Sequence, residues 1–192
     1  MIHRLTLAFA IAGVIALPAF AQDSPKHDDN FDVHSSVGDL HVGSDADARK
    51  IGLPLYPGSR PKPSKDHDGD SNQANLSLFT EAFGFKLVVA SYESDDPSPK
   101  ILDFYRDKLK KYGKVLECHT HKHGGDADIN DDDDKDHGNQ LRCDGENSGP
   151  VTELKVGMED DQHIVAVEPH DSGKGSSLTL LYLHAHGKKG DI

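Results

Sequence analysis

The chain has 192 residues, with 33 acidic and 21 basic side chains and a net charge of −12 at neutral pH. A surface this acidic repels nucleic acid and anionic lipid head groups, so neither is an expected partner. The length suits one domain, which we expect to be a monomer.

The N-terminus has the three-part pattern of a secretory signal peptide. Residues 1–4 form a short basic region, residues 5–17 are almost all apolar, and Pro18 precedes a small-residue cleavage site at residues 19–21. The apolar run is shorter than the roughly 20 residues that a membrane-spanning helix needs. We therefore expect a periplasmic or secreted protein that starts near Gln22 and has no membrane span after cleavage.

Composition divides the rest of the chain. Residues 22–50 are rich in Asp, Ser, His and Gly, which predicts a flexible acidic leader. Residues 51–187 are expected to form a single domain, followed by a tail at residues 188–192. Inside the domain, a stretch rich in His and Asp at about residues 121–137 is expected to be disordered.

Hydrophobic periodicity predicts the elements of this domain in chain order. Alternation over residues 76–78 and 83–89 indicates strands, and Gly84 indicates a bulge or a close backbone approach. A helix is expected from Ser98 to Gly113, with one apolar stripe. Strands should follow at residues 114–119, 139–144, 151–156, 163–168 and 177–186, the last three as hairpins. The expected fold class is α+β, with one main helix packed on a largely antiparallel sheet.

Several motifs follow one another along the chain: a Tyr-Pro-Gly turn at residues 56–58, Phe104-Tyr105 in the helix, and the strand sequences at residues 152–157 and 162–168. This order resembles a family of uncharacterised bacterial exported proteins over most of residues 51–183. The resemblance implies export and a single domain. It supplies no catalytic residues.

The two cysteines, Cys118 and Cys143, are expected to form a disulfide because exported proteins fold in an oxidising environment. We expect the bond to join adjacent antiparallel strands. The alternatives are two buried thiols or half of a metal site.

Histidines near Cys118 suggest a weak metal site. The candidate ligands are His119, His121, His123 and His137, together with neighbouring aspartates. Imidazole favours Zn or Cu, but an acidic loop with incidental histidines is the favoured interpretation.

Two other clusters have weaker support. His184 and His186 could join the first cluster only if their strands are neighbours. A calcium-like loop begins at Asp66, but its glycine and its twelfth residue, Ser77, depart from the calcium-binding pattern.

No hydrolase, nucleotide-binding or zinc-protease motif is present in the sequence. We therefore expect a non-enzymatic binding or structural domain of the cell envelope or exterior. No cofactor is expected; if a metal binds, we expect weakly bound Zn or Cu. The alternatives are a metal-binding or metal-buffering protein and, third, an unrecognised hydrolase.

Overall fold

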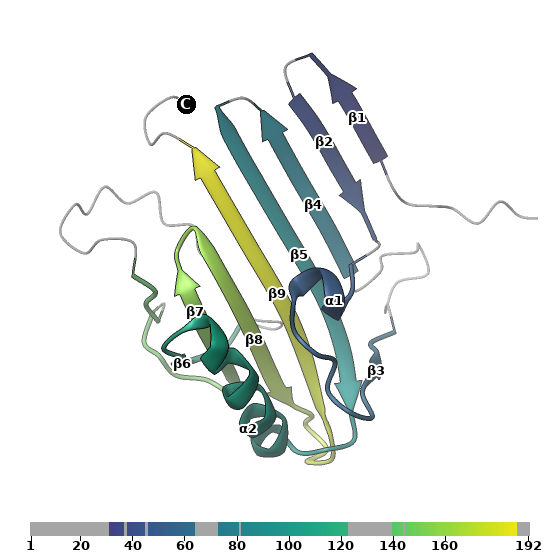
Figure 1. Ribbon diagram of the computed structural model, residues 1–192. Coiled ribbons are helices and arrows are strands. Elements are labelled where there is room, and N and C mark those ends of the chain that lie inside the picture. The colour runs from purple at the N-terminus through teal and green to yellow at the C-terminus, as the bar shows by residue number, and fades with distance from the viewer. Residues whose placement is uncertain are drawn as a thin grey trace, which may run out of the picture.

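An antiparallel sheet with helices on one face forms the framework of the protein (Figure 1). The computed structural model describes residues 31–36, 38–44, 46–63, 73–80, 82–122, 140–143 and 145–187. The sheet order is β1-β2-β4-β5-β9-β8-β7-β6, and the short β3 pairs with β5. The strands are β1 (Phe31–Ser35), β2 (Gly38–Gly43), β3 (Arg60–Pro61), β4 (Gln73–Thr80), β5 (Phe83–Ser94), β6 (Leu116–Thr120), β7 (Val151–Met158), β8 (Asp161–Pro169) and β9 (Ser176–Gly187). The helices are α1 (Ala48–Ile51), α2 (Ser98–Leu109) and the 3₁₀ turn η1 (Lys110–Tyr112).

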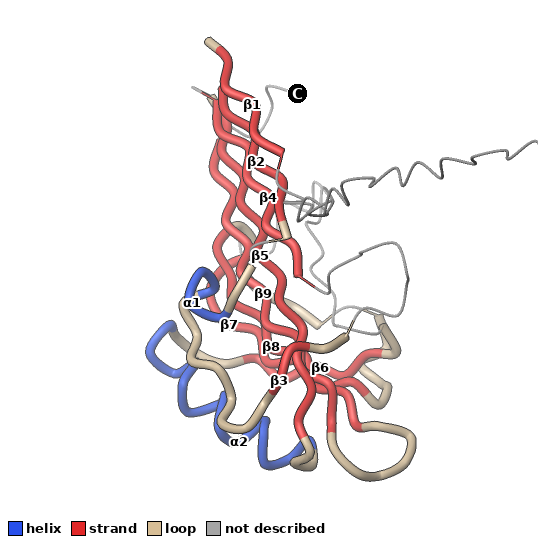
Figure 2. Tube along the Cα trace, turned by 90° about the vertical axis from the view of Figure 1, so that its right-hand side faces the viewer, coloured by secondary structure: helices blue, strands red, loops and turns tan. Residues whose placement is uncertain are grey.

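The α+β class with one main helix on an antiparallel sheet is confirmed. The β7–β8 and β8–β9 connections are antiparallel hairpins, as the short turn-like segments predict. Figure 2 shows the helices on one side of the sheet only, with β1, β2 and β4 extending beyond them. In the described part of the chain, no helix is long and apolar enough to cross a membrane.

The main core lies between the helices and the sheet. The stripe of α2 buries Ile101, Tyr105 and Leu109 completely, because these residues recur on one side of the helix. The helix starts one residue earlier than a Ser98 cap would give: Pro97 is the N-cap, and the Ser98 hydroxyl contacts the Ser176 hydroxyl at 2.9 Å. Facing α2 and α1 are apolar side chains of the central strands: Val88, Ala90, Leu154, Val156, Val165, Val167, Leu178 and Leu180.

The expectation of a flexible leader over residues 22–50 is wrong for residues 31–50. This segment contains β1, β2 and the start of α1. Its few apolar side chains alternate along the two strands, and Asp47 caps α1 by accepting hydrogen bonds from the backbone of Arg49 and Lys50. The sequence analysis missed the period-two pattern of β1 and β2 because the overall hydrophobicity of this segment is low. The predicted tail at residues 188–192 lies outside the described residues.

A strand at residues 139–144 is also not observed. The described residues 140–143 form no strand, and β6 pairs with β7 instead. Most of the expected disordered stretch at residues 121–137 lies outside the described residues, as does the calcium-like loop beginning at Asp66. Gly84 does permit a close approach: a Cβ added there would collide with the imidazole of His186.

Candidate functional site: an apolar sheet face

The face of the sheet opposite the helices carries a second set of apolar side chains. On this side, the strand registers align residues across β1, β2, β4, β5 and β9 into two neighbouring rows. We call these two rows the apolar face. One row is Phe31, Val42, Leu76, Leu87 and Leu183, and the other is Val33, Leu40, Leu78, Phe85 and Ala185.

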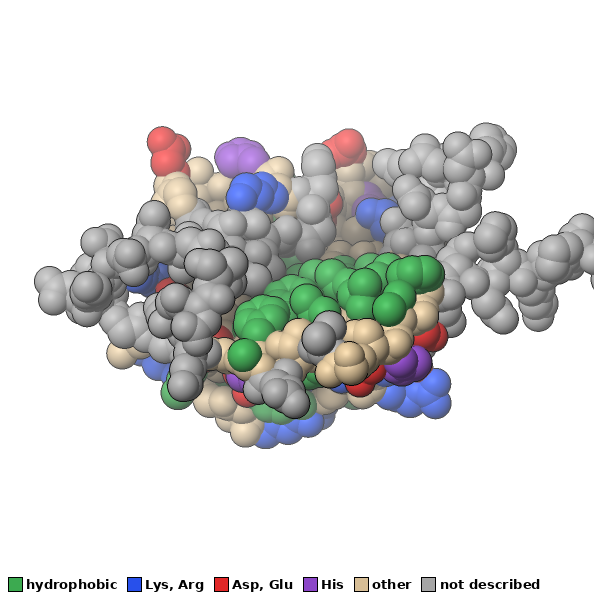
Figure 3. Space-filling model, turned by 90° about the horizontal axis from the view of Figure 1, so that it is seen from above, with side chains coloured by type: hydrophobic (Ala, Val, Ile, Leu, Met, Phe, Trp, Pro, Cys, Tyr) green, Lys and Arg blue, Asp and Glu red, His purple; other side chains and the backbone are tan. Residues whose placement is uncertain are grey.

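The apolar face becomes more exposed toward the β1 edge. Leu183 on β9 is 1% exposed, whereas Leu78 on β4 is 37%, Val42 on β2 is 41% and Phe31 on β1 is 59% exposed. Figure 3 shows hydrophobic side chains gathered in one continuous surface patch. The apolar side chains therefore continue outward from a buried cluster formed by Ile164, Leu181 and Leu183.

The reverse side of the β1–β2 hairpin is polar. On the β1–β2 hairpin, His41 Nδ1 lies 2.6 Å from a carboxylate oxygen of Asp32, and His34 Nδ1 lies 2.9 Å from one of Asp39. Each of these residues alternates with an apolar-face residue, since successive side chains of a strand point to opposite sides. In this part of the sheet the apolar side therefore faces away from the helices, the reverse of the arrangement in the main core.

The long strands β5 and β9 carry both apolar surfaces. Toward the helices, β5 buries Val88 and Ala90, and β9 buries Leu178 and Leu180. On the other side, Phe85, Leu87 and Val89 of β5 pack against the second cluster. Helices α1 and α2 cover the first surface (Figures 1 and 2), while no described helix lies over the apolar face.

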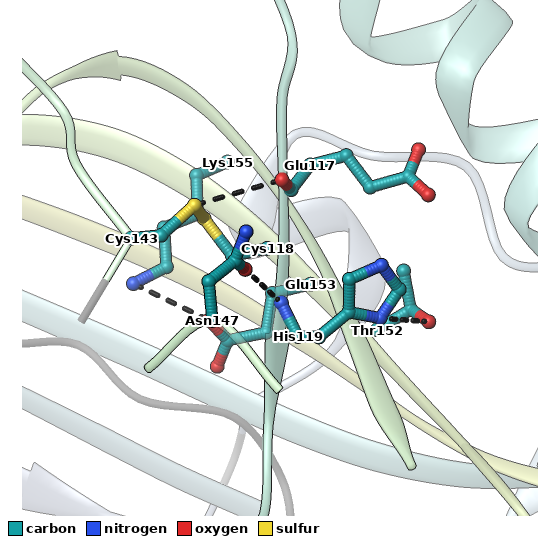
Figure 4. Close-up of a disulfide and its surroundings, with 8 residues drawn as sticks. All are labelled: Glu117, Cys118, His119, Cys143, Asn147, Thr152, Glu153 and Lys155. Atoms are coloured by element: carbon teal, nitrogen blue, oxygen red, sulfur yellow. Dashed lines mark hydrogen bonds and ion pairs between the residues drawn. A yellow bond between two sulfur atoms is a disulfide. The ribbon is translucent and has the colours of Figure 1, made fainter. Parts of the chain in front are cut away.

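A disulfide and a buried ion pair lie at the β6–β7 end of the same side of the sheet (Figure 4). Cys118 of β6 is bonded to Cys143, with Cα atoms 5.3 Å apart, so the predicted pairing is confirmed. The bond does not join two adjacent strands as expected, because Cys143 lies outside any strand. It fastens the segment around Cys143 to β6, and the backbone N–H of His119 donates to Asn147 Oδ1 at 2.7 Å in the same region.

The ion pair joins Lys155 Nζ and Glu153 Oε2 at 3.3 Å, with both side chains no more than 3% exposed. Glu153 is the register partner of Cys118, so the pair lies beside the disulfide. Buried charges are costly unless they are paired, so the two side chains must stay together in the folded protein. The pair therefore has a structural role.

The predicted metal ligands are not gathered in the described structure. His119 Nδ1 lies 3.4 Å from the Thr152 hydroxyl, and His121 is exposed beyond the end of β6. His123 and His137 lie outside the described residues. Within the described part of the chain, no group of three or more His, Cys, Asp or Glu side chains is placed to hold a metal. The metal hypothesis stays a prediction.

His184 and His186 are part of a different arrangement. Their strand, β9, is separated from β6 by β8 and β7, so they do not meet His119 and His121. On the helix side of the sheet, they continue a row of rings that starts with Tyr112, His163 and Tyr182. This row links η1 to the sheet.

The motif residues that suggest a family resemblance have structural roles. Tyr56 is 4% exposed and donates a hydrogen bond to Asp96 Oδ2 at 2.7 Å. Burial, with the Asp96 carboxylate as a second cause, raises the pKa of Tyr56 to about 12, so the phenol remains protonated at neutral pH. Tyr105 donates to the Pro54 carbonyl at 3.1 Å. These contacts fasten the Tyr-Pro-Gly segment onto α2 and the strand end.

No family model, no curated protein and no solved structure matches the chain.

The sequence analysis did not find the apolar face. Its signal was present in residues 31–42, where Phe31 and Val33, then Leu40 and Val42, alternate with Asp and His. Strands of five and six residues with only two large apolar residues each do not stand out against an acidic background. The apolar residues of these strands form part of a face only because the strand registers align them with β4 and β5.

Proposed function

We propose that this protein is an exported, non-enzymatic binding domain. Its apolar face binds an apolar surface of a protein partner. The observation that carries the proposal is the continuity of that face. Single exposed apolar residues are ordinary, but a contiguous apolar patch on a folded chain is typical of an interaction site. Phe31, Val33, Val42 and Leu78 are each more than a third exposed and lie in adjoining strands.

The shape of the face favours a protein partner over a small ligand. Small-molecule sites are concave, because a ligand must lose most of its contact with water. The apolar face is instead assembled from alternate residues of neighbouring strands, and such a surface packs well against another sheet or an apolar helix. The net charge of −12 also argues against an anionic membrane surface.

Export is supported by the signal-peptide pattern of residues 1–21 and by the disulfide between Cys118 and Cys143. The absence of a recognised catalytic motif in the sequence supports a binding role over an enzymatic one. Together these features favour a partner in the periplasm or outside the cell.

Site-specific photo-crosslinking in an exporting cell tests the proposal. A photoreactive phenylalanine analogue replaces Leu78, which is on the apolar face and 37% exposed. The matched control replaces Phe79, the next residue in β4, which is 39% exposed on the opposite side. Equal exposure and adjacent positions make the side of the sheet the main difference between the two variants.

We expect a single heterologous protein to be crosslinked at position 78 and not at position 79, and the same protein to be recovered with the analogue at Val42. The crosslink should disappear when Phe31 is also replaced by Lys, because a charge would then enter the docked surface. Equal crosslinking at both positions, no crosslink at all, or capture of this same chain alone would each overturn the proposal.

A further inference from the structure

The outer strand of the sheet, β1, ends in an unpaired backbone edge in the described structure. It pairs with β2 on one side, and no other described strand lies on its other side. All five residues of β1 are exposed. An exposed edge strand is a template for pairing with another strand.

The register of β1 determines which backbone groups point outward. Ser35 pairs with Gly38 across a connection of two residues. In such a hairpin, the residues beside the connection form a hydrogen-bonded pair, and bonded and non-bonded pairs then alternate. By this alternation, Phe31, Val33 and Ser35 direct their backbone groups to β2, and Asp32 and His34 direct theirs outward.

We propose that β1 pairs antiparallel with β1 of a second copy of this chain, about a two-fold axis at Val33. In this register, Asp32 is hydrogen-bonded opposite the partner's His34, and His34 is opposite the partner's Asp32. The two outward-facing residues of each strand thus exchange backbone hydrogen bonds with those of the other. The interface is isologous, as expected for a dimer with two-fold symmetry.

Charge complementarity selects this register. Within one chain, Asp32 already lies beside His41, and His34 beside Asp39. Pairing centred on Val33 extends these contacts into a line running His41, Asp32, the partner's His34 and the partner's Asp39. Acid and imidazole alternate along the whole line, so each carboxylate lies between two imidazoles or at an end.

In the neighbouring registers, aspartate no longer lies opposite histidine. Centring the pair on Asp32 places two aspartates opposite each other, and centring it on His34 places two histidines opposite each other. Two aspartates directly across a strand pair repel each other, and two opposed histidines each lose the carboxylate acceptor that the proposed register gives them. Charged edge residues usually prevent self-association, but this pair is complementary to its own copy in one register.

The same pairing joins the apolar faces of the two copies. Val33 meets the partner's Val33 on that side, and Phe31 lies opposite the partner's Ser35. The two apolar faces then form one surface across the axis. The dimer proposal rests on the backbone edge and the charges of β1, and it holds whether or not a heterologous partner occupies the apolar face.

A cysteine at the axis tests the geometry. The protein is expressed as the full-length chain, and Val33→Cys is compared with Leu78→Cys. The two native residues are on the same side of the sheet and are 38% and 37% exposed. Facing residues at the axis lie within disulfide-forming distance. We expect Val33→Cys to form a covalent dimer under mild oxidation at least about tenfold faster than Leu78→Cys, because pairing raises the local thiol concentration.

Charge variants test the register. Asp32→Lys places Lys opposite His34 of its copy, and His34→Asp places Asp opposite Asp32. Each change is expected to weaken self-association in sedimentation equilibrium by about tenfold. A mixture of the two variants should recover dimers, because each heterodimer has one Lys–Asp pair and one His–Asp pair.

Recovery in the mixture separates the proposed register from simple unfolding of the hairpin, since each variant chain is unchanged by mixing. A wild-type chain that stays monomeric at about 1 mM, where a dimer with a millimolar dissociation constant would be populated, would overturn the proposal. Equal crosslinking at positions 33 and 78, or no recovery in the mixture, would also overturn it.

Discussion

The imidazole of His163 is held between two aromatic rings. Its ring centroid lies 4.0 Å from that of Tyr112 and 4.7 Å from that of Tyr182. Burial lowers the pKa of His163 below the ordinary value of 6.5, against a smaller opposing effect of the Asp161 carboxylate. At neutral pH the ring is therefore uncharged, and it packs as an aromatic group that fixes η1 against β8 and β9.

This environment predicts a specific dependence of stability on pH. Below about pH 6.5, the unfolded chain binds a proton at His163 that the folded protein resists. The free energy of unfolding should therefore fall as the pH drops from 6.5 toward the lower folded-state pKa. His163→Phe keeps a stacked ring without a titrating group. Urea unfolding between pH 5 and pH 7, at steps of about half a unit, should show a smaller decrease for this variant.

The matched control is His121→Phe, at an exposed position beyond β6. It should retain the wild-type slope of stability against pH. An unchanged slope in His163→Phe, or an equal reduction in both variants, would contradict the role assigned to His163.

Among the elements, β6 and the segment around Cys143 depend most on a covalent link. Cys143 is outside any strand, so the disulfide holds a segment against the sheet and does not set a strand register. The β6–β7 register has its own ladder from Leu116 to Thr120. Loss of the disulfide should therefore loosen the segment while β6 stays paired with β7.

Replacing Cys118 and Cys143 together by Ala is expected to destabilise the protein by about 3–4 kcal/mol, the chain-entropy value for a sequence separation of 25 residues. Thermal unfolding by circular dichroism should show a lower melting temperature with an unchanged far-ultraviolet spectrum at 20 °C. A spectrum without its strand signal would show instead that the disulfide determines the sheet itself.

Local patterns allowed most of the central elements to be predicted. Residues of α2 and of β7, β8 and β9 have strong periodicity and short connections, which determine their type and neighbours. The prediction of a strand at residues 139–144 was wrong. Leu141 and Cys143 alternate over too short a run to distinguish a strand from a segment held by a disulfide. The β1–β2 hairpin was missed because its composition is that of a loop.

For the candidate site, the sequence predicted the Cys118–Cys143 pair but not the apolar face. An oxidising compartment and the presence of two cysteines are enough to suggest a single disulfide. The apolar face, in contrast, depends on sheet order: β9 lies between β5 and β8, which aligns Leu87 with Leu183. Such long-range registers are not encoded in any one segment of the chain.

At the scale of the whole molecule, the sheet has two apolar surfaces with different coverings. Helices α1 and α2 cover one surface, and the other continues to the β1 edge with rising exposure. A net charge of −12 favours dispersion in water through charge repulsion, which is compatible with an exposed apolar surface. The proposed binding surface is therefore the apolar face, and the helix-covered half is its structural support.

The proposed binding role requires that the exposed part of the apolar face bind apolar groups in the folded protein. Titration with an environment-sensitive hydrophobic dye tests it directly, with Leu78→Lys compared with Phe79→Lys at nearly equal exposure on opposite sides of β4. We expect saturable fluorescence enhancement for the wild type and for Phe79→Lys, and a response weaker by about fivefold or more for Leu78→Lys, since a charge among the bound apolar groups costs about 1 kcal/mol or more. No enhancement with the wild type, or the same response from both variants, would contradict it.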